Sequence, residues 1–263
     1  MTILDQIVEH KRTEELPRHM RDLSLEDVQA RATVAPPPRN FIAALRSTPG
    51  VTLIAEVKRA SPSKGLLRPD LDPVNLATTY AANGAAAISV LTDEKYFQGG
   101  LTDLAQIRQA LNLPLLRKDF IIHPYQVYEA RVAGADALLL IATVLSDDDL
   151  AELLALTRAL GMAALVEVHS GDELARVLPL KPRLVGVNNR DLRNFRVDLN
   201  TCLSLRPLVP AEICFVAESG IHTRADVARL AAAGVDAMLV GEALVVAPDV
   251  AAKVRELANG RES

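Results

Sequence analysis

Five polar side chains end short apolar runs in five separate stretches of the chain. They are Lys58, Lys118, Glu167, Asn188 and Glu218. In each stretch aliphatic residues lead into a charged or amide side chain, and a loop-like sequence follows. If these runs are parallel strands of one closed sheet, their ends meet at one rim and the polar groups converge on one cavity. Lysines and glutamates gathered in this way have shifted pKa values, which suits acid–base catalysis.

The apolar runs belong to a longer series of strand patterns. They are near-continuous rather than alternating, as expected for strands that are covered on both faces. We expect eight strands, at Val51–Val57, Ala86–Leu91, Pro114–Arg117, Ala137–Ala142, Ala163–Val166, Leu184–Val187, Ile213–Ala217 and Ala237–Val240.

Helical patterns lie between these runs, and we expect eight helices to match the strands. They include Pro73–Asn83, Leu101–Leu111, Pro124–Ala133, Asp147–Leu160 and Arg224–Ala233. Strands that alternate with helices predict a parallel sheet, and the length of the repeating region suits a (β/α)8 TIM barrel. The competing arrangement, a doubly wound open sheet, usually has a G-x-G-x-x-G turn after its first strand, and this sequence has none there.

Capping residues mark several helix boundaries. Ser146, Ser170 and Thr223 each precede an acidic residue by three positions, which is the pattern of a capping box or its Asp variant. Asp136 and Asp236 occupy equivalent helix-to-strand junctions, and we assign them a structural role at those junctions.

Residues 1–48 precede the barrel pattern, which extends over residues 49–263. Leu4–Lys11 and Leu25–Ala32 have helical patterns, and the proline run Pro36–Pro38 interrupts the chain after them. This segment is too short for a safe independent core. We therefore expect a helical extension packed on the barrel, and a single domain over residues 1–263.

Composition excludes several classes of protein. The chain has 263 residues and a formal net charge of −4, which argues against a general nucleic-acid binder. No apolar stretch approaches the roughly 18 residues that span a bilayer, and the N-terminus lacks a signal-like apolar centre. Cys202 and Cys214 lack metal-ligand spacing and are expected to be reduced core thiols. We expect a cytoplasmic protein that binds a small molecule and neither nucleic acid nor membrane.

Two glycine-containing turns indicate a phosphate site. Ser219-Gly220 follows the seventh strand and Gly241 follows the eighth, where barrels commonly bind phosphate. Glycine lets backbone N–H groups approach the phosphate oxygens, and a short helix start supplies further donors. We expect Val245–Asp249 to provide that helix start.

The segment Ile54–Gly65, which reads Ile-Ala-Glu-Val-Lys-Arg-Ala-Ser-Pro-Ser-Lys-Gly, is far more specific. It resembles the first strand and following loop of the indole-3-glycerol phosphate synthases, which are tryptophan-pathway barrel enzymes. The resemblance covers essentially the whole chain, including the extension. Its other segments are Leu91–Gly100, Leu116–Ile121, Leu165–His169, Gly186–Leu192 and Ala217–Ile221.

The resemblance implies a carbon–carbon lyase that acts on 1-(o-carboxyphenylamino)-1-deoxyribulose 5-phosphate. Such an enzyme closes the pyrrole ring with loss of CO2 and water, and it uses no metal or organic cofactor. Lys118 would be the general acid that assists attack of the anthranilate ring on the ribulosyl carbonyl. Lys58 would pair with the substrate carboxylate and is a candidate proton donor in the later dehydration. Glu167 and Glu56 would supply acid–base and charge-balancing groups, and the division of proton transfers within each pair stays open.

The remaining site residues implied by the resemblance hold the substrate. Asn188 and Ser219 would position hydroxyl and carboxylate groups, and Glu218 with Arg190 would support the site. The phosphate would lie on Ser61, Gly220 and Gly241, and the aromatic ring between Phe97 and Phe120. Glu242 would contribute its backbone N–H to the phosphate. We expect its side chain to turn away, because a carboxylate beside phosphate is repulsive.

Two rival functions fit parts of the pattern. A phosphoribosylanthranilate isomerase is another phosphate-binding barrel, but relatives of that type carry a cysteine on the first strand, and here that strand ends in Glu56-Val57-Lys58. A barrel that has lost catalysis and serves as a sensor or scaffold could keep the phosphate glycines, but Lys118 and Glu167 would then be dispensable.

Three histidines and the oligomeric state complete the expectations. His123, His169 and His222 lie near strand ends, and we assign them to helix capping or loop packing rather than catalysis. We expect a monomer, with association with other tryptophan-pathway enzymes left open.

Overall fold

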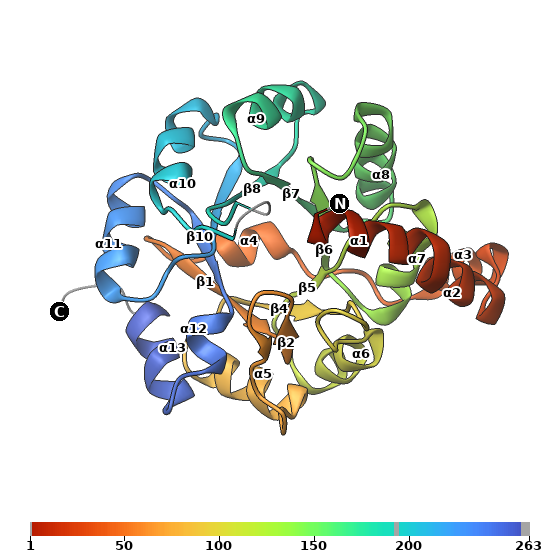
Figure 1. The fold of residues 1–263 in the computed structure, drawn as a ribbon, viewed down its shortest axis with the longest axis horizontal. Coiled ribbons are helices and arrows are strands. Elements are labelled where there is room, and N and C mark those ends of the chain that lie inside the picture. The colour runs from red at the N-terminus through yellow and green to blue at the C-terminus, as the bar shows by residue number, and fades with distance from the viewer. Residues whose placement is uncertain (1, 192–194, 259–263) are drawn as a thin grey trace.

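Eight parallel strands form a closed barrel within the part of the chain that the computed structural model describes, residues 2–191 and 195–258. Neighbours in the barrel run in the order β1-β10-β9-β8-β7-β6-β5-β4. The strands are β1 (Thr52–Val57), β4 (Ala87–Leu91), β5 (Leu115–Lys118), β6 (Ala137–Ile141), β7 (Ala163–Val168), β8 (Leu184–Asn188), β9 (Cys214–Glu218) and β10 (Ala237–Val240). The predicted (β/α)8 barrel is confirmed (Figure 1). Leu192, which ends the resemblance segment Gly186–Leu192, lies outside the described residues.

Several strands extend further than the sequence predicted, by one or two residues at the carboxyl end. Lys118, Asn188 and Glu218 are the final residues of β5, β8 and β9, and Glu167 lies within β7. Their backbones keep the sheet register, since Asn188 pairs with Glu218 across β8 and β9. The apolar pattern ends earlier than the strand because these side chains face the mouth of the barrel instead of its packed core.

An outer layer of helices covers the sheet. It comprises α5 (Pro73–Ala82), α6 (Leu101–Ala110), α7 (Pro124–Ala133), α8 (Asp147–Ala159), α9 (Gly171–Val177), α10 (Asn200–Leu205), α11 (Arg224–Ala232) and α13 (Val250–Ala258). Single 3-10 turns, Leu178–Leu180 and Arg206–Leu208, follow α9 and α10. The predicted caps form, since Ser146, Ser170 and Thr223 each accept a hydrogen bond from the backbone three residues later.

The junction aspartates have the structural role that was predicted. Asp136 accepts hydrogen bonds from the backbone N–H groups of Arg39 and Leu115, at 2.6 and 2.8 Å. Asp236 accepts from the backbone N–H of Phe215 at 2.8 Å. Each carboxylate therefore ties the start of one strand to the junction before the next, far from the mouth.

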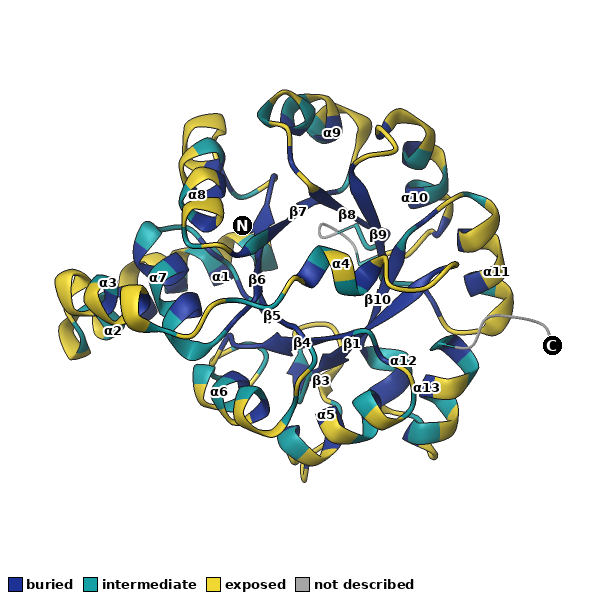
Figure 2. Cartoon of the chain, turned by 180° about the vertical axis from the view of Figure 1, so that it is seen from behind, coloured by how far each residue is buried: buried dark blue, intermediate teal, exposed yellow. Residues whose placement is uncertain are grey.

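The barrel interior is filled by aliphatic side chains, among them Ile54, Leu116 and Leu165. Cys214 belongs to this core, and Cys202 belongs to the layer between sheet and helices. Both thiols are free and buried, as expected. Figure 2 shows the continuous buried sheet inside a shell of half-exposed helices.

The N-terminal extension reaches both ends of the barrel. It contains α1 (Ile3–His10), a π-helical turn (Lys11–Glu15), α2 (Leu16–Asp22), α3 (Leu25–Val34) and α4 (Phe41–Leu45). Phe41 and Leu45 of α4 pack into the interior core at the closed end, where Figure 2 shows α4 lying across the barrel. Leu16 and Val28 pack against Tyr125 of α7. At the other end, Ile3 and Ile7 of α1 line the pocket at the mouth.

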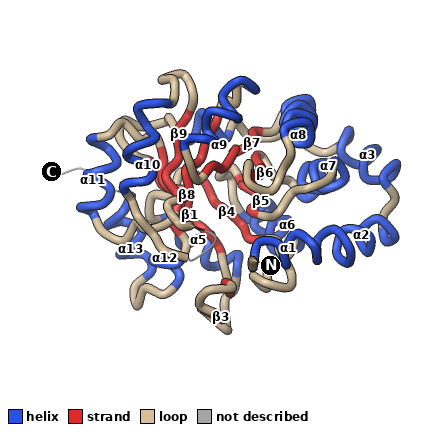
Figure 3. The backbone as a smooth tube through the Cα atoms, turned by 45° about the horizontal axis from the view of Figure 1, so that its top comes forward, coloured by secondary structure: helices blue, strands red, loops and turns tan. Residues whose placement is uncertain are grey.

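Two small elements lie at the mouth. A hairpin of β2 (Ala60–Ser61) and β3 (Gly65–Leu66) follows β1 and projects from the barrel end (Figure 3). The short helix α12 (Glu242–Val245) follows β10 directly, with Gly241 as its N-cap. The prediction that Val245–Asp249 begins this helix was wrong. The strand ends at Val240 and the helix begins at Glu242, so the helix starts three residues earlier than expected.

None of the described helices combines the length and apolar composition needed to cross a membrane.

Candidate active site

Lys118 lies at the centre of a charged group at the carboxyl ends of the strands. Its Nζ is 3.3 Å from Glu167 Oε2 and 3.4 Å from Glu218 Oε2. Asn188 donates from Nδ2 to Glu167 Oε1 at 3.4 Å and accepts from the backbone N–H of Arg190 at 3.0 Å. The strands thus bring together polar groups that lie up to 100 residues apart in the sequence. The predicted convergence of these side chains is confirmed.

Burial and proximity set the charge states of this group. Burial lowers the pKa of Lys118, but the charges of Glu167, Glu218 and Glu56 outweigh it and the net shift is upward. Burial raises the pKa of Glu167, yet the nearby Lys118 and His169 cations reverse this and the net shift is downward. Burial raises the pKa of Glu218 to about 8, with repulsion from Glu167 adding to the effect of burial and Lys118 opposing it. The pKa values of the two glutamates are therefore separated. Near neutral pH Glu167 is a carboxylate and Glu218 holds a proton.

Glu56 and Lys58 form a second pair at the end of β1. Lys58 Nζ lies 2.8 Å from Glu56 Oε1. The Glu56 carboxylate occupies the space beside Gly241, where a Cβ would lie only 2.1 Å from Oε1. Gly241 is thus needed to accommodate Glu56, in addition to its predicted place in the phosphate site.

Gly186 on β8 makes the equivalent space for Glu218. A Cβ at this position would lie 2.2 Å from Glu218 Oε1. Gly186 was not among the predicted site residues. A glycine inside an apolar strand pattern was the available signal, because it marks a close approach of another group.

The aromatic pair Phe97 and Phe120 forms one wall of the pocket. Their ring centroids lie 6.1 Å apart with the rings tilted by 38°. Asp93 accepts from the backbone N–H of Phe97 at 3.1 Å, and Asp119 accepts from that of Phe120 at 2.8 Å. Two buried carboxylates therefore fix the loops that carry the aromatic wall.

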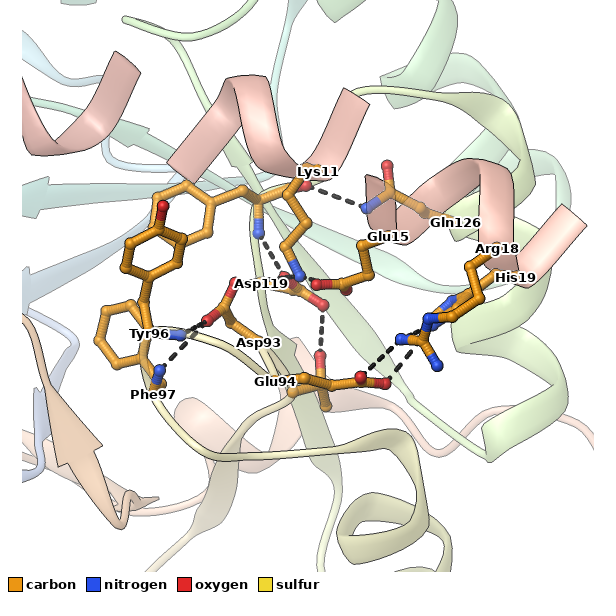
Figure 4. Close-up of polar contacts among 12 residues, drawn as sticks. Lys11, Glu15, Arg18, His19, Asp93, Glu94, Tyr96, Phe97, Asp119 and Gln126 are labelled. Atoms are coloured by element: carbon orange, nitrogen blue, oxygen red, sulfur yellow. Dashed lines mark hydrogen bonds and ion pairs between the residues drawn. The ribbon is translucent and has the colours of Figure 1, made fainter. Parts of the chain in front are cut away.

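Those carboxylates belong to a second buried ionic cluster, centred on Lys11 of the extension (Figure 4). Lys11 Nζ lies 2.5 Å from Glu15, 3.1 Å from Asp93 and 2.7 Å from Asp119. On β5 the buried Arg117 contacts the same Asp119 at 3.0 Å. We call Lys11, Glu15, Asp93, Arg117 and Asp119 the Lys11 cluster. It anchors the extension to the loops after β4 and β5.

Sequence reasoning missed the Lys11 cluster, although a signal was present. Ile7, Lys11 and Glu15 are spaced four residues apart, so two charged residues continue a stripe that begins with a buried Ile. Charged side chains on the inward face of a helix indicate buried partners elsewhere in the chain.

The residues predicted to hold phosphate lie in the same pocket. Ser61, Gly220, Gly241 and Ser219 all line the same pocket as Lys118. Ser219 and Gly220 have φ values of 66° and 77°, so the backbone turns sharply after β9. This turn follows β9 directly, so both residues lie at the mouth of the barrel.

The expectation for the Glu242 side chain was wrong. The carboxylate does not turn away from the pocket, which it helps to line. It lies 3.6 Å from Arg190 Nη2 and 3.8 Å from Lys64 Nζ. The attraction of these two cations favours this position of the carboxylate.

Of the three histidines near strand ends, all in the described part of the chain, only His169 contacts the charged group around Lys118. His123 caps α7, where its Nδ1 accepts from the backbone N–H of Tyr125 at 3.1 Å, as predicted. His222 lines the pocket, and its backbone N–H donates to Asp226. His169 differs from the prediction, because its Nε2 lies 3.3 Å from Glu167 Oε1 and so contacts the charged group directly. Within the described residues, no group of three or more His, Cys, Asp or Glu side chains is arranged to hold a metal ion.

Comparison with known proteins settles the family. Residues 4–257 match the family model described as indole-3-glycerol phosphate synthase. The chain belongs to the indole-3-glycerol phosphate synthase family. It is 55% identical over 267 residues to the indole-3-glycerol phosphate synthase of Roseiflexus sp. (strain RS-1), covering 98% of this chain and 99% of that protein. A relative of the same name from Dehalococcoides mccartyi (strain ATCC BAA-2266) is 59% identical over 210 residues, which is 79% of this chain and 81% of that protein.

Solved structures at lower identity share the fold alone. A 3-hexulose-6-phosphate synthase superposes with a TM-score of 0.63 at 17% identity, covering 80% of this chain and 99% of that one. A thiamine phosphate pyrophosphorylase from Pyrococcus furiosus gives 0.61 at 19% identity, covering 84% and 97%. Membership of the indole-3-glycerol phosphate synthase family makes this protein a carboxy-lyase of tryptophan biosynthesis, as the resemblance implied.

Proposed function

We propose that this protein closes the indole ring of 1-(o-carboxyphenylamino)-1-deoxyribulose 5-phosphate, with Lys118 as the general acid. The observation that carries this assignment is the placement of the Lys118 ammonium between Glu167 and Glu218 in the pocket beside Phe97 and Phe120. An ammonium in that position can donate to a carbonyl oxygen of a substrate whose aromatic ring lies against the phenylalanines.

The first step is formation of the carbon–carbon bond. The ring carbon that carries the anthranilate carboxylate attacks the ribulosyl carbonyl carbon, and Lys118 Nζ donates a proton to the carbonyl oxygen as it becomes a hydroxyl. General-acid assistance of this kind contributes roughly 10²–10⁴ in rate. Lys58 pairs with the carboxylate and Phe97 and Phe120 hold the ring, so that the reacting carbons meet in a productive geometry.

The second step is loss of CO2, which restores the aromatic ring. The carbon–carboxylate bond breaks and its electron pair returns to the ring, so that no external electron acceptor is needed. The Lys58 ammonium must release the carboxylate as it becomes neutral. Its partner Glu56, 2.8 Å away, can then take over the interaction with Lys58.

The third step is dehydration. The new hydroxyl leaves as water, which requires a proton for the oxygen and removal of a proton from the substrate skeleton. Lys58 and Lys118 are candidate donors, and the ionised Glu167 is the candidate base because its pKa is lowered. Protonated Glu218 supports the same group, while Asn188 and Ser219 position hydroxyls of the ribulosyl arm.

Phosphate binding at the opposite side of the pocket would hold the flexible arm. The backbone N–H groups of Gly220, Gly241 and Glu242 and the hydroxyl of Ser61 are the proposed donors, and Arg190 adds charge. Binding energy from this remote group would be used to orient the reacting carbons.

The test is a turnover assay with the purified protein and the carboxyphenylamino-deoxyribulose phosphate, without added metal. Formation of the indole product is followed by fluorescence, which is clean because the chain contains no tryptophan. We expect stoichiometric conversion to indoleglycerol phosphate. Failure of the wild-type protein to form an indole would reject the proposed function.

We further propose that the protein acts as a monomer. All the site residues named above come from one chain, and the extension of the same chain covers the closed end of the barrel and lines the pocket at its mouth. Sedimentation equilibrium across the assay concentration range tests this, and a specific activity that rises with protein concentration would contradict it.

A further inference from the structure

His169 connects the charged group at the mouth to the first turn of helix α9. It is adjacent to the last residue of β7, and its Nε2 lies 3.3 Å from Glu167 Oε1. The other ring nitrogen, Nδ1, lies 3.4 Å from Glu173 Oε2 and 3.3 Å from Thr143 Oγ1. The imidazole therefore stands between a carboxylate inside the pocket and a carboxylate outside it.

Glu173 holds the imidazole in this position. Its carboxylate accepts from the backbone N–H of His169 at 2.7 Å and from Thr143 Oγ1 at 2.7 Å. Its own backbone N–H donates to the N-cap Ser170 at 3.2 Å. The acceptor opposite Nδ1 is thus anchored by a helix terminus, which orients Nε2 toward Glu167.

Charge balance favours the protonated form of His169. Burial lowers its pKa, but the hydrogen bond to Glu173 and the charges of Glu167, Glu173 and Glu218 outweigh burial, and the net shift is upward. A carboxylate lies beside each ring nitrogen, Glu167 at Nε2 and Glu173 at Nδ1. The protonated imidazole therefore faces an anion on both sides.

Other charged side chains lie near the partners of this imidazole. Lys118 of β5 contacts the opposite oxygen of Glu167. Thr143, which contacts Nδ1, lines a groove together with Asp5, Glu9 and Arg12 of the N-terminal extension. The carboxylates in direct contact with His169 are those of Glu167 and Glu173.

We propose that His169 is a positioning residue for Glu167, holding its carboxylate beside Lys118 and keeping it ionised in the working pH range. This inference rests on the proposed function, since it assigns His169 to the base of the dehydration step. Removal of the imidazolium would let Glu167 take up a proton at a higher pH. A nearby positive charge typically lowers the pKa of a carboxyl group by about 1–3. Without the imidazolium, the acid limb of the pH–kcat profile should therefore move to a higher pH, by about one pH unit.

Two variants separate charge from orientation. In His169→Gln the terminal amide nitrogen can still lie beside Glu167, near the position of Nε2, but it carries no charge. In His169→Asn the shorter amide reaches only the position of Nδ1, so both charge and contact are lost. We expect both variants to show the upward shift of the acid limb. At its optimum pH, His169→Asn should lose about 10–100-fold in kcat, and His169→Gln clearly less, because a misplaced catalytic group costs on this order.

His123→Asn is the matched control. His123 also precedes a helix beyond a strand end, but its ring accepts from a backbone N–H, and asparagine can replace it as an N-cap. Its pH–kcat profile should match that of the wild type. Thermal unfolding of all variants checks that each is folded at the assay temperature.

The outcomes are distinguishable. An unmoved acid limb in both His169 variants would overturn the inference, even if kcat falls, because a purely structural histidine predicts that result. Equal kcat in the Asn and Gln variants would mean that the contact with Glu167 does not orient its carboxylate. That result would overturn the positioning role. A wild-type protein without turnover would instead reject the proposed function itself.

Discussion

Two buried ionic clusters lie on opposite faces of the end of β5, and they balance their charges differently. Successive residues of a strand point to opposite faces, so Lys118 faces the barrel mouth while Arg117 and Asp119 face the outer layer. The Lys11 cluster on the outer side pairs each carboxylate closely with a cation, and Lys11 itself is 1% exposed. Lys118 on the inner side is 15% exposed, and its contacts are longer.

The pKa values of one carboxyl group from each cluster, Asp119 and Glu218, show the difference between the clusters. Burial raises the pKa of Asp119, but Lys11 and Arg117 overcome this and the net shift is strongly downward. In contrast the pKa of Glu218 is raised to about 8, and within the described residues its carboxyl oxygens accept no hydrogen bond, with the Lys118 ammonium 3.4 Å away. A carboxylate held by two close cations, as Asp119 is, contributes to structure, whereas Glu218, which has one cation at 3.4 Å, can exchange protons with a ligand.

The largest expected effect comes from breaking the inner cluster. Lys118→Ala should lower kcat by about 10²–10⁴, because the proposed proton donor is gone, while KM changes little. Its unfolding free energy should change less than that of a Lys11 variant, since the neighbouring Glu218 can remain protonated. The fluorescence assay and denaturant unfolding measure both quantities. Equal losses in turnover and in substrate affinity would contradict a general-acid role.

Breaking the outer cluster should give the opposite pattern. Lys11→Met leaves three carboxyl groups without their shared cation, and removal of one partner from a buried pair costs about 3–5 kcal/mol. We expect this loss in the free energy of unfolding, with kcat of the folded protein much closer to wild type than in Lys118→Ala. A Lys11→Met protein of wild-type stability would show that the comparison between the clusters is wrong.

The two clusters should also respond oppositely to pH. The raised pKa of Glu218 means that its stabilising effect is complete below its unfolded value of about 4.5 and is lost as the pH rises through about 8. The lowered pKa of Asp119 means that its effect is present above about 3.8 and is lost as the pH falls. Glu218→Gln, a neutral mimic, should therefore flatten the decline in stability between about pH 4.5 and about pH 8 without changing the loss at lower pH. An unchanged decline over this range would mean that another group carries the raised pKa.

The smallest effect is expected at the exposed rim of the pocket. Glu242 competes with a bound anion for Arg190 and Lys64, but all three side chains are partly exposed, so the interaction is weak. Glu242→Gln should lower the inhibition constant of inorganic phosphate by about 2–5-fold, as expected for an exposed pair worth below about 1 kcal/mol. Competitive inhibition measured against the substrate gives this constant. Weaker phosphate inhibition in the variant would mean that Glu242 supports the anion site.

The sequence by itself determined the barrel and the residues of its mouth. Continuous apolar runs, capping residues and glycines are local signals, and the alternation of strand and helix leaves few ways to pack them. Because parallel strands of a closed barrel end at one rim, Lys118, Glu167, Asn188 and Glu218 could be predicted to meet.

Only the tertiary structure decided which of those groups touch and what surrounds them. The Lys11 contact with Asp119, the space that Gly186 leaves for Glu218 and the contact of His169 with Glu167 depend on the distance between side chains from separate elements. The same is true of Glu242, which was expected to turn from the pocket but is held there by two cations from other loops. Electrostatic interactions depend steeply on distance and burial, and neither quantity is encoded in local sequence patterns.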